Sequence, residues 1–312
     1  MGYRIFPFQN YSNENINIKI ATLNCKNLTT TSEPEKFQWI IKQIRDSDAD
    51  IISLQEINKV EALSTIISLI NNAAADGDRY AECHHELPLD NSRIHEYIGF
   101  IYKTDKVKSH GCVTFTDEDK KRYIGNINKL MIRSPVYAKF SSSSSSGDNS
   151  VIPIIILAYH CNQKHPMYDC IHIKNNLKAI QCTNPHVKTY FILGDFNTHC
   201  EDLLSFRKLY KRGWNSIFTS KNIYTNTINT TQYDHIWYHS ENTKLIGEPI
   251  VLRQAEAAHS DHCLVVGTFE IKGMVSSKSD SLISSPDMYS VLNAKLRIKK
   301  KFNNICGCFN VA

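Results

Sequence analysis

The sequence predicts an α/β protein in which two mixed β-sheets pack face to face with helices outside. Short apolar runs typical of strands recur along the chain, with polar segments between them. Helical spacing separates some of these runs but not all, so the chain lacks the strict alternation of a doubly wound parallel sheet. Of the 312 residues, 42% are hydrophobic and 21% are charged, a composition that supports a sizeable globular core in one large domain or two small ones.

The elements follow from the spacing of apolar residues. Ile16–Asn24 alternates and then turns apolar, as a strand that enters a core does. Glu35–Arg45 has helical spacing after the start signal Ser-Glu-Pro. Asp50–Gln55 indicates a second buried strand, with a helix after it over roughly 58–72. Further along, a helix is expected near 170–181, and strands are expected at Tyr97–Lys103, Val136–Phe140, Ile152–Tyr159, Thr189–Leu193, Asp234–Tyr238 and His262–Ile271.

Serine-rich stretches mark one loop and one domain boundary. The run Ser141–Ser146 is expected to form a flexible loop, because apolar strands lie on both sides of it. After Ile271 the chain becomes Ser-rich and then basic. We therefore expect an N-terminal extension at residues 1–15, one folded domain at 16–271 and a flexible tail at 272–312.

The positive charge is concentrated in the tail. Residues 271–312 carry seven basic and two acidic side chains, which account for the whole net charge of +5. A surface that coats DNA uniformly is therefore not expected, and phosphates must bind at a local site or at the tail. The tail admits three interpretations: a disordered basic segment, a nucleic-acid or nuclear-import patch, and a membrane attachment through acylated Cys306 and Cys308 beside Lys299–Lys301.

The ten cysteines are spread along the chain without the paired spacing of zinc fingers. The first twenty residues lack the apolar core of a signal peptide, and no stretch approaches the roughly 18 apolar residues of a membrane span. We expect free thiols in an intracellular protein, cytoplasmic or nuclear, that has no transmembrane segment and is a monomer.

Polar and ionisable residues stand at the ends of the predicted strands, where the active sites of sheet enzymes gather. One such residue is explained as well by a helix cap or a buried histidine, but eight placed alike are not. These residues are Asn24, Glu56, His160, Asp195, Asn197, Asp234, Asp261 and His262.

This inventory suits the hydrolysis of phosphodiesters. The oxygen atoms of Glu56 and Asp261, with the amide of Asn24, would hold a hard cation such as Mg²⁺ rather than zinc. Such a cation polarises the phosphoryl oxygen and offsets the charge that grows in the transition state. One histidine would take a proton from water and another would donate one to the leaving oxygen, each fixed by a carboxylate.

The motifs NCKN, LQE, HEYIGFIY, RSP, YH, GDFN, YDHI and SDH together resemble the endonuclease/exonuclease/phosphatase superfamily, and within it the deoxyribonuclease I type. The resemblance spans roughly residues 16–271 and implies a four-layer α/β sandwich. GDFN and SDH are shared across the superfamily. Arg133-Ser134-Pro135 before the strand VYAKF is more specific, because it resembles the deoxyribonuclease branch, whose arginine contacts a substrate phosphate.

The resemblance implies a role for each residue. The metal, Mg²⁺ with Ca²⁺ or Mn²⁺ as alternatives, would be bound by Asn24, Glu56 and Asp261. Two carboxylate–histidine pairs would form, Glu96 with His160 and Asp234 with His262. Asp195 would support the metal-bound nucleophile, and the substrate would contact Asn197, Arg133 and Arg93.

Two departures from the family pattern bear on function. The loop that reaches the DNA minor groove in the family is replaced here by Asn91–Glu96, which is one residue longer and has Arg93 as the candidate for the groove. The secreted members pair a cysteine at the place of Cys200 with a position that is Thr231 here, so that bridge cannot form.

We expect a Mg²⁺-dependent endonuclease that hydrolyses DNA by in-line attack of water, with His160 and His262 as its acid/base pair. RNA and phospholipids are the alternative substrates. The leading alternative function is a phosphoinositide phosphatase or a sphingomyelinase-like phosphodiesterase of the same fold, for which an acylated tail would argue. The other is a catalytically inactive binding protein, which is disfavoured because every catalytic position is filled.

Overall fold

The computed structural model describes residues 12–73, 79–87, 95–115, 133–143, 151–199, 204–218, 223–228, 230–253 and 259–273. All of them belong to one unit, residues 1–274. Four parts of the sequence-based prediction lie outside the described residues. They are most of the N-terminal extension, Arg93, Cys200 and the tail beyond residue 273. Within the described part, no helix is both long enough and apolar enough to cross a membrane.

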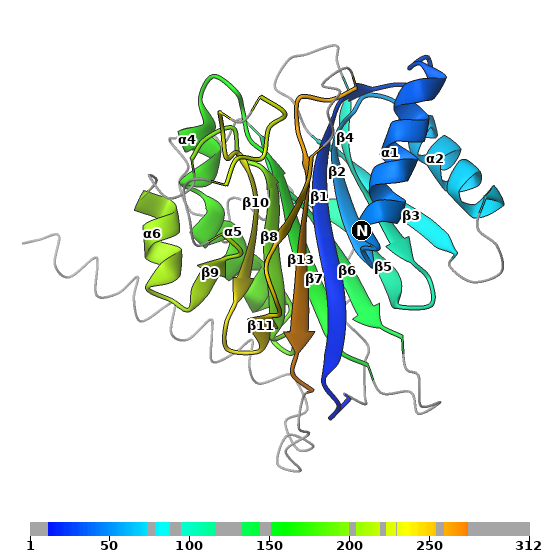
Figure 1. Cartoon of the computed structure of the whole chain (residues 1–312). Coiled ribbons are helices and arrows are strands. Elements are labelled where there is room, and N and C mark those ends of the chain that lie inside the picture. Colours follow the sequence, from blue (N-terminus) through cyan, green and yellow to red (C-terminus); the bar gives the residue numbers. More distant parts are fainter. Residues whose placement is uncertain are drawn as a thin grey trace, which may run out of the picture. The chain divides into compact units, whose positions relative to one another are not determined.

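The first sheet has seven strands in the order β11-β13-β1-β2-β4-β3, with β12 also beside β13. Only β1 and β2 run parallel, so the sheet is mixed. Helices α1 (Pro34–Ser47) and α2 (Glu61–Asn72) lie on its outer side (Figure 1). The strands are β1 (Ile16–Leu28), β2 (Ile51–Ile57), β3 (Tyr80–Leu87), β4 (Glu96–Lys103), β11 (Thr243–Leu245), β12 (Ile250–Leu252) and β13 (Leu264–Ile271).

The second sheet has six strands in the order β5-β6-β7-β8-β10-β9, of which only β7 and β8 run parallel. Helices α4 (Pro166–Cys170), α5 (Ile173–Thr183) and α6 (Leu204–Tyr210) accompany it on the other side of the domain (Figure 1). The strands are β5 (Val107–Thr114), β6 (Val136–Ser142), β7 (Pro153–His160), β8 (Thr189–Asp195), β9 (Trp214–Ser216) and β10 (Asp234–His239).

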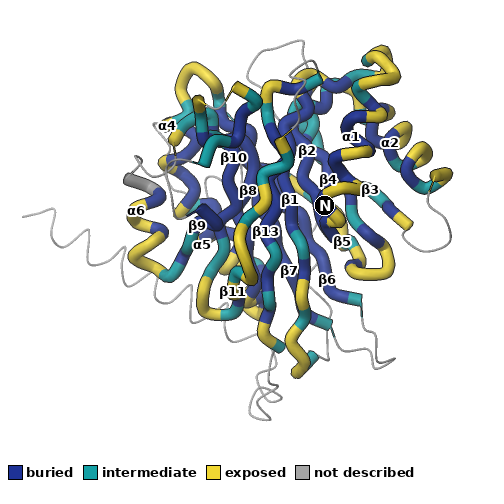
Figure 2. Tube along the Cα trace, viewed as in Figure 1, coloured by how far each residue is buried: buried dark blue, intermediate teal, exposed yellow. Residues whose placement is uncertain are grey.

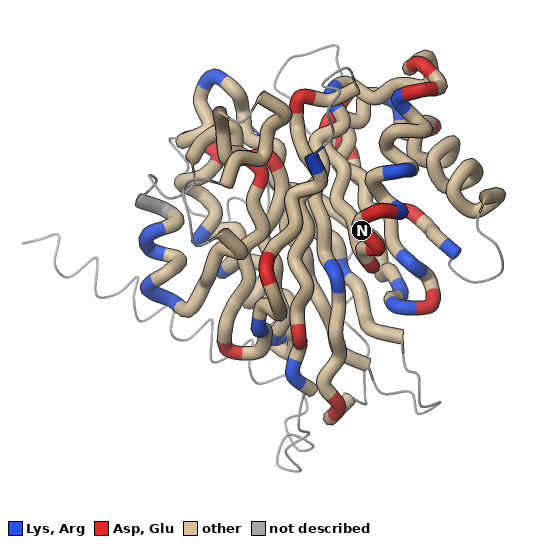
Figure 3. The backbone as a smooth tube through the Cα atoms, viewed as in Figure 1, with Lys and Arg blue, Asp and Glu red and all other residues tan. Residues whose placement is uncertain are grey.

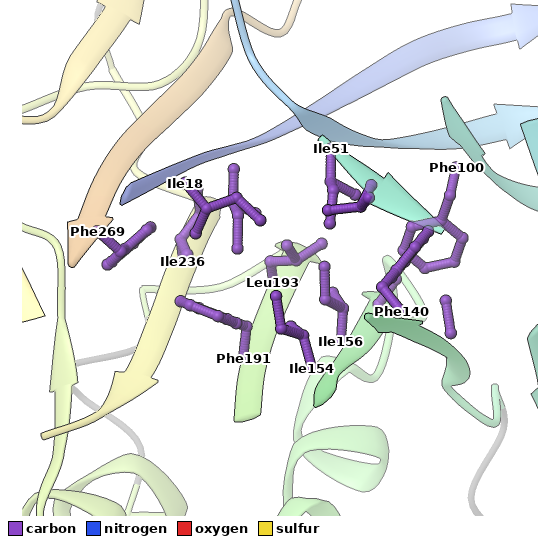
Figure 4. Close-up of a cluster of buried hydrophobic side chains, with 14 of the residues drawn as sticks. Ile18, Ile51, Phe100, Phe140, Ile154, Ile156, Phe191, Leu193, Ile236 and Phe269 are labelled. Atoms are coloured by element: carbon purple, nitrogen blue, oxygen red, sulfur yellow. The ribbon is translucent and has the colours of Figure 1, made fainter. Parts of the chain in front are cut away.

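Three apolar layers hold these parts together. The middle layer lies between the sheets. In it, side chains of the first sheet pack on those of the second, for example Phe100 on Phe140 and Phe269 on Phe191 (Figure 4). One outer layer packs α1 and α2 on the first sheet, and the other packs α5 and α6 on the second. The central strands of both sheets are accordingly buried along most of their length (Figure 2). The expected four-layer α/β sandwich is confirmed.

The expected strands and helices are present. The short strands β9, β11 and β12 and the short helices α4 and α6 were not expected from the sequence, and two longer strands and one loop also differ. The strands β3 and β5 are absent from the sequence-based prediction because both lie at sheet edges and expose polar residues such as His84 and His110. The serine run is only partly a loop, because Ser141 and Ser142 are buried at the end of β6. Pairing with β5 and β7 overrides the turn-forming composition there.

Gly194 allows β7 and β8 to approach each other directly before the end of β8. It lies opposite Tyr159 and has a φ of +124°, a conformation that other residues rarely adopt. A Cβ atom at this position would lie 2.0 Å from the backbone oxygen of Tyr159. The glycine of the GDFN motif is therefore a packing requirement, and it sets the position of Asp195.

We expect Gly194→Ala to lower the free energy of unfolding by about 2–5 kcal/mol, because backbone strain adds to the clash with a neighbouring strand. Gly247→Ala is the matched control, since Gly247 also has a positive φ (+69°) but a Cβ atom added there would meet nothing within 4 Å. The control should lose only about 1–2 kcal/mol. Urea denaturation measures both, and equal losses would contradict the packing argument.

The described cysteines are all free thiols. The sulfur atoms of Cys161 and Cys170 come within 3.7 Å of each other without a bond. Since a disulfide contributes roughly 2–4 kcal/mol when present, a protein without one should not respond to reduction. We expect a reducing agent to leave the melting temperature unchanged. A sharp fall, or cysteine-linked peptides in mass spectra of unreduced digests, would show a structural disulfide.

Candidate active site

The register of the second sheet places three polar side chains in a row at one edge. His160 ends β7 and lies opposite Asp195, which ends β8. Asp195 in turn lies opposite Asp234, which begins the antiparallel strand β10. All three residues are buried. Figure 3 shows acidic positions gathered at this upper edge of the two sheets.

The first sheet brings Asn24 and Glu56 to the same edge from the carboxyl ends of β1 and β2. Both strands have an irregularity there, which turns a side chain away from its regular direction. Glu56 has a φ of 57°, in the left-handed region where a residue with a side chain is strained. The Asn24 amide nitrogen donates to Glu56 Oε1 at 2.9 Å, and that oxygen lies 3.6 Å from His160 Nε2.

Asp195 is the point on which the two sheets converge. Its Oδ2 accepts from the Asn24 amide at 3.0 Å and lies 3.6 Å from His262 Nε2 and 3.9 Å from His160 Nε2. Its Oδ1 accepts from the backbone N–H of Asn197 at 2.8 Å. Burial raises the pKa of Asp195 above its ordinary value, although the two histidines act in the opposite direction.

Glu96, from the start of β4, hydrogen-bonds His160 Nδ1. Arg133 lies against this pair, with Nη2 3.4 Å from Glu96 Oε2 and Nη1 3.5 Å from the backbone oxygen of His160. Nη1 also lies 2.8 Å from Nδ1, but we assign the Nδ1 proton to the carboxylate, which is the stronger acceptor.

The charges around this pair set two pKa values. Burial is the largest influence on His160 and lowers its pKa, but the hydrogen bond and charge of Glu96, with the charge of Asp195, raise it overall. Burial likewise raises the pKa of Glu96, yet His160 and Arg133 outweigh burial and lower it. Glu96 is therefore the ionised partner that orients the imidazole.

A second pair forms on the other side of Asp195. His262 Nδ1 lies 2.9 Å from Asp234 Oδ2, which also accepts from the Thr225 hydroxyl at 2.9 Å. Burial alone would lower the pKa of His262, but the charges of Asp234 and Asp195 and the hydrogen bond with Asp234 raise it to about 10. Thr225 was not among the candidates drawn from the sequence, because a threonine in a polar segment carries no signal of its own.

Asp261 lies at the exposed rim of the site. Its Oδ1 is 3.5 Å from the ammonium of Lys26, and the contacts of the described residues do not pair it with Asn24 or Glu56. Lys36, from α1, donates to the backbone oxygen of Lys26. Burial lowers the pKa of Lys36, while the charges of Glu56 and Asp261 act against that lowering. Neither lysine was among the candidates drawn from the sequence.

The donor set fits a hard divalent cation. Carboxylate oxygens dominate it, and Asp234 Oδ1 is buried without a hydrogen-bond partner among the described residues. One group with ligand atoms within 4.8 Å of one another comprises Asp195, Asp234 and His262. None of these three residues was expected from the sequence to bind the metal. A hard cation prefers oxygen to imidazole nitrogen, so the oxygen atoms around Glu56 and Asp195 suit it better than His262 does.

Asn24 and Asn197 use their amides within the protein. Asn24 Oδ1 accepts from the backbone N–H of Lys26 at 2.8 Å, so its nitrogen rather than its oxygen faces the carboxylates. Asn197 Nδ2 donates to the backbone oxygen of Cys161 at 2.9 Å, and its φ of 50° is again left-handed. The structure thus brings all the described site candidates to one edge, with Asp261 at its rim. Arg93 lies outside the described residues.

No family model matches the chain, and no curated protein matches it in sequence. Several solved structures are similar to it in fold. The human Nocturnin catalytic domain with bound sulfate is 15% identical with a TM-score of 0.58, covering 83% of this chain and 97% of that one. An endonuclease/exonuclease/phosphatase family protein from Bacteroides thetaiotaomicron is 15% identical with a TM-score of 0.56, covering 83% and 99%. A mannosyl-6-phosphatase from the same organism is 14% identical with a TM-score of 0.54, covering 81% and 99%.

Proposed function

We propose that this chain, which has the endonuclease/exonuclease/phosphatase fold, is a divalent-metal-dependent phosphodiesterase and more specifically an endonuclease that hydrolyses DNA. One observation carries the proposal. Two histidines, each paired with a buried carboxylate, direct their Nε2 atoms toward the same oxygen of Asp195, at 3.9 Å for His160 and 3.6 Å for His262. Two oriented proton carriers beside one carboxylate suit in-line hydrolysis of a phosphodiester, because one can take a proton from the attacking water and the other can donate one to the leaving oxygen.

The residues divide the work of the reaction. Arg133 and Asn197 would hold the oxygens of the phosphate, and Asp195 would accept a hydrogen bond from the attacking water. His160 and His262 would act as the acid/base pair, one on the attacking side and one at the leaving oxygen. Glu96 and Asp234 would keep each ring in the tautomer that presents Nε2 to the substrate.

We propose Asn24, Glu56 and Asp261 as the ligands of the cation, with Mg²⁺ first and Ca²⁺ or Mn²⁺ as alternatives. When bound, the cation would offset the charge that grows on the phosphate in the transition state. Asn24 would join this set by a half-turn of its amide, since the same group can offer nitrogen to carboxylates or oxygen to a cation.

The choice of DNA rests on Arg133-Ser134-Pro135, because the fold itself is shared by enzymes with different substrates. The mannosyl-6-phosphatase has the same fold, so the fold selects no substrate. We place the activity in residues 16–271. The free thiols among the described cysteines, and Thr231 at the position of the family's second cysteine, support an intracellular protein. A monomer is also part of the proposal.

A phospholipid phosphodiesterase is the second candidate, and one observation favours it. The segment around α4 exposes three large apolar side chains, Met167 at 66%, Tyr168 at 46% and Ile171 at 50%. The buried Asp169 of the same helix accepts a hydrogen bond from the backbone N–H of Arg133, so α4 lies beside the site. Exposed apolar groups next to a phosphate site suit a lipid surface. Release of phosphocholine or inositol phosphate from vesicles, without cleavage of plasmid, would establish this candidate instead.

The cation requirement is tested with supercoiled plasmid. We expect nicking with Mg²⁺ and none with excess chelator. Glu56→Gln should raise the Mg²⁺ concentration that gives half-maximal activity at least tenfold while the melting temperature changes little, because Glu56 is partly exposed. Glu270→Gln, on β13 away from the site, is the control and should match the wild type. Activity that survives the chelator unchanged would refute the metal assignment.

The acid/base assignment is tested by removing each imidazole. His160→Ala and His262→Ala should each lower kcat by roughly 10²–10⁴-fold, the usual range for a lost acid or base. The double variant should be little worse than the poorer single one, because the two groups act in one step. His239→Ala, at the opposite end of β10 from Asp234, controls for loss of a histidine as such. Near-normal nicking by both single variants would discard the assignment.

A further inference from the structure

Asp169 is a buried carboxylate that the reaction as proposed does not use. It lies on α4 and has no exposed surface. Its Oδ1 accepts from the backbone N–H of Arg133 at 2.9 Å, and its Oδ2 accepts from the backbone N–H of Asn162 at 2.8 Å. Burying a carboxylate is costly, so a residue that is fully enclosed with an N–H on each oxygen has a defined task.

Both backbone groups belong to segments that build the site. Arg133 stands three residues before β6 and directs its guanidinium to Glu96 and to the backbone oxygen of His160. Asn162 lies two residues after His160, just beyond the end of β7. One carboxylate therefore joins the segment that carries Arg133 to the segment that follows His160.

The segment after β7 is fixed at several neighbouring points. The backbone N–H of Cys161 donates to the backbone oxygen of Asp195 at 2.9 Å, and the backbone oxygen of Cys161 accepts from Asn197. These contacts attach the end of β7 to β8, but they do not reach Arg133. Among the contacts of the described residues, the one to Asp169 joins the backbone of Arg133 to this framework.

We propose that Asp169 is a positioning residue that holds Arg133 where it binds the substrate phosphate. The proposal rests on the phosphodiesterase function and deepens it. Asp169 does not touch the substrate; it fixes the backbone from which the guanidinium extends. Its removal should therefore weaken substrate binding through Arg133 and leave the two carboxylate–histidine pairs in place.

The test is a double-mutant cycle of Asp169→Asn with Arg133→Ala. Asparagine keeps the shape of the side chain but turns an N–H toward one of the two backbone donors, so one contact is lost. We expect Asp169→Asn to raise KM for plasmid or bis(p-nitrophenyl) phosphate about tenfold, with kcat changed less than threefold. In the Arg133→Ala background the same change should alter kcat/KM less than twofold, because the arginine is then absent.

Asp50→Asn is the matched control. Asp50 is also buried and also accepts a backbone N–H, from Lys19 at 2.8 Å, but at the opposite end of β1 and β2. It should lose stability without any change in KM. If Asp169→Asn does not fold, Asp169→Ser, which keeps one acceptor, replaces it. If neither variant folds, Asp169 is a folding residue and the positioning role is rejected.

The outcomes separate this proposal from the proposed function. An unchanged KM in a folded Asp169→Asn variant, or an equal loss with and without Arg133, overturns the positioning role. If the wild type cleaves neither substrate with Mg²⁺ or Mn²⁺, the phosphodiesterase function fails. Binding of a fluorescent DNA oligonucleotide in the presence of Mg²⁺, which such a protein would not cleave, then decides the positioning role alone. Coupling of the effects of the two substitutions on binding supports the role, and independent effects overturn it.

Discussion

The site depends on one constraint, the burial of the Asp195 carboxylate between the ends of two sheets. A buried carboxylate without partners would cost several kcal/mol, so the surrounding groups must compensate it. The Asn24 amide comes from the first sheet and the Asn197 N–H comes from the turn after β8. The two imidazoles approach from the end of β7 and from the segment just before β13. At this edge an interface that is otherwise apolar becomes polar. The same contacts thus hold the site residues in place and join the two sheets at this edge.

Strain accompanies these contacts. Glu56 and Asn197 both adopt left-handed backbone conformations, which cost roughly 1–3 kcal/mol each. Gly194 removes the steric conflict that any side chain would create between β7 and β8. The three apolar layers offset this cost, because each fully buried large side chain contributes roughly 1.5–3 kcal/mol. The core therefore does more than stabilise the fold, since it allows the site to keep a geometry that isolated segments would not adopt.

The sequence predicts the elements that have a repeating apolar pattern, and it does not predict the features that depend on single contacts. Apolar periodicity predicts the central strands, and polar residues at their ends mark Asn24, Glu56, His160 and Asp195 as neighbours at one edge. Edge strands such as β3 are not predicted, because their partly exposed positions carry polar residues and the apolar pattern is lost. Thr225 and Asp169 are not predicted for a different reason. Each acts through a contact with a residue distant in sequence, and such a contact leaves no repeating pattern in the sequence. The orientation of the Asn24 amide and the pairing of Asp261 with Lys26 likewise depend on tertiary geometry.

The distribution of charge links cation binding to substrate binding. The centre of the site is acidic, with Glu56, Glu96, Asp195 and Asp234 within one polar network, and such a centre repels a phosphate. Three cationic groups of the described residues stand beside it: Arg133 next to Glu96, Lys26 next to Asp261, and His262, whose raised pKa favours the imidazolium, next to Asp234. Because the body of the chain carries no net charge, its long-range field does not draw in a polyanion. In the proposed reaction a phosphodiester would approach only where the acidic centre is neutralised, so the carboxylates that fit a cation would also make substrate binding depend on that cation.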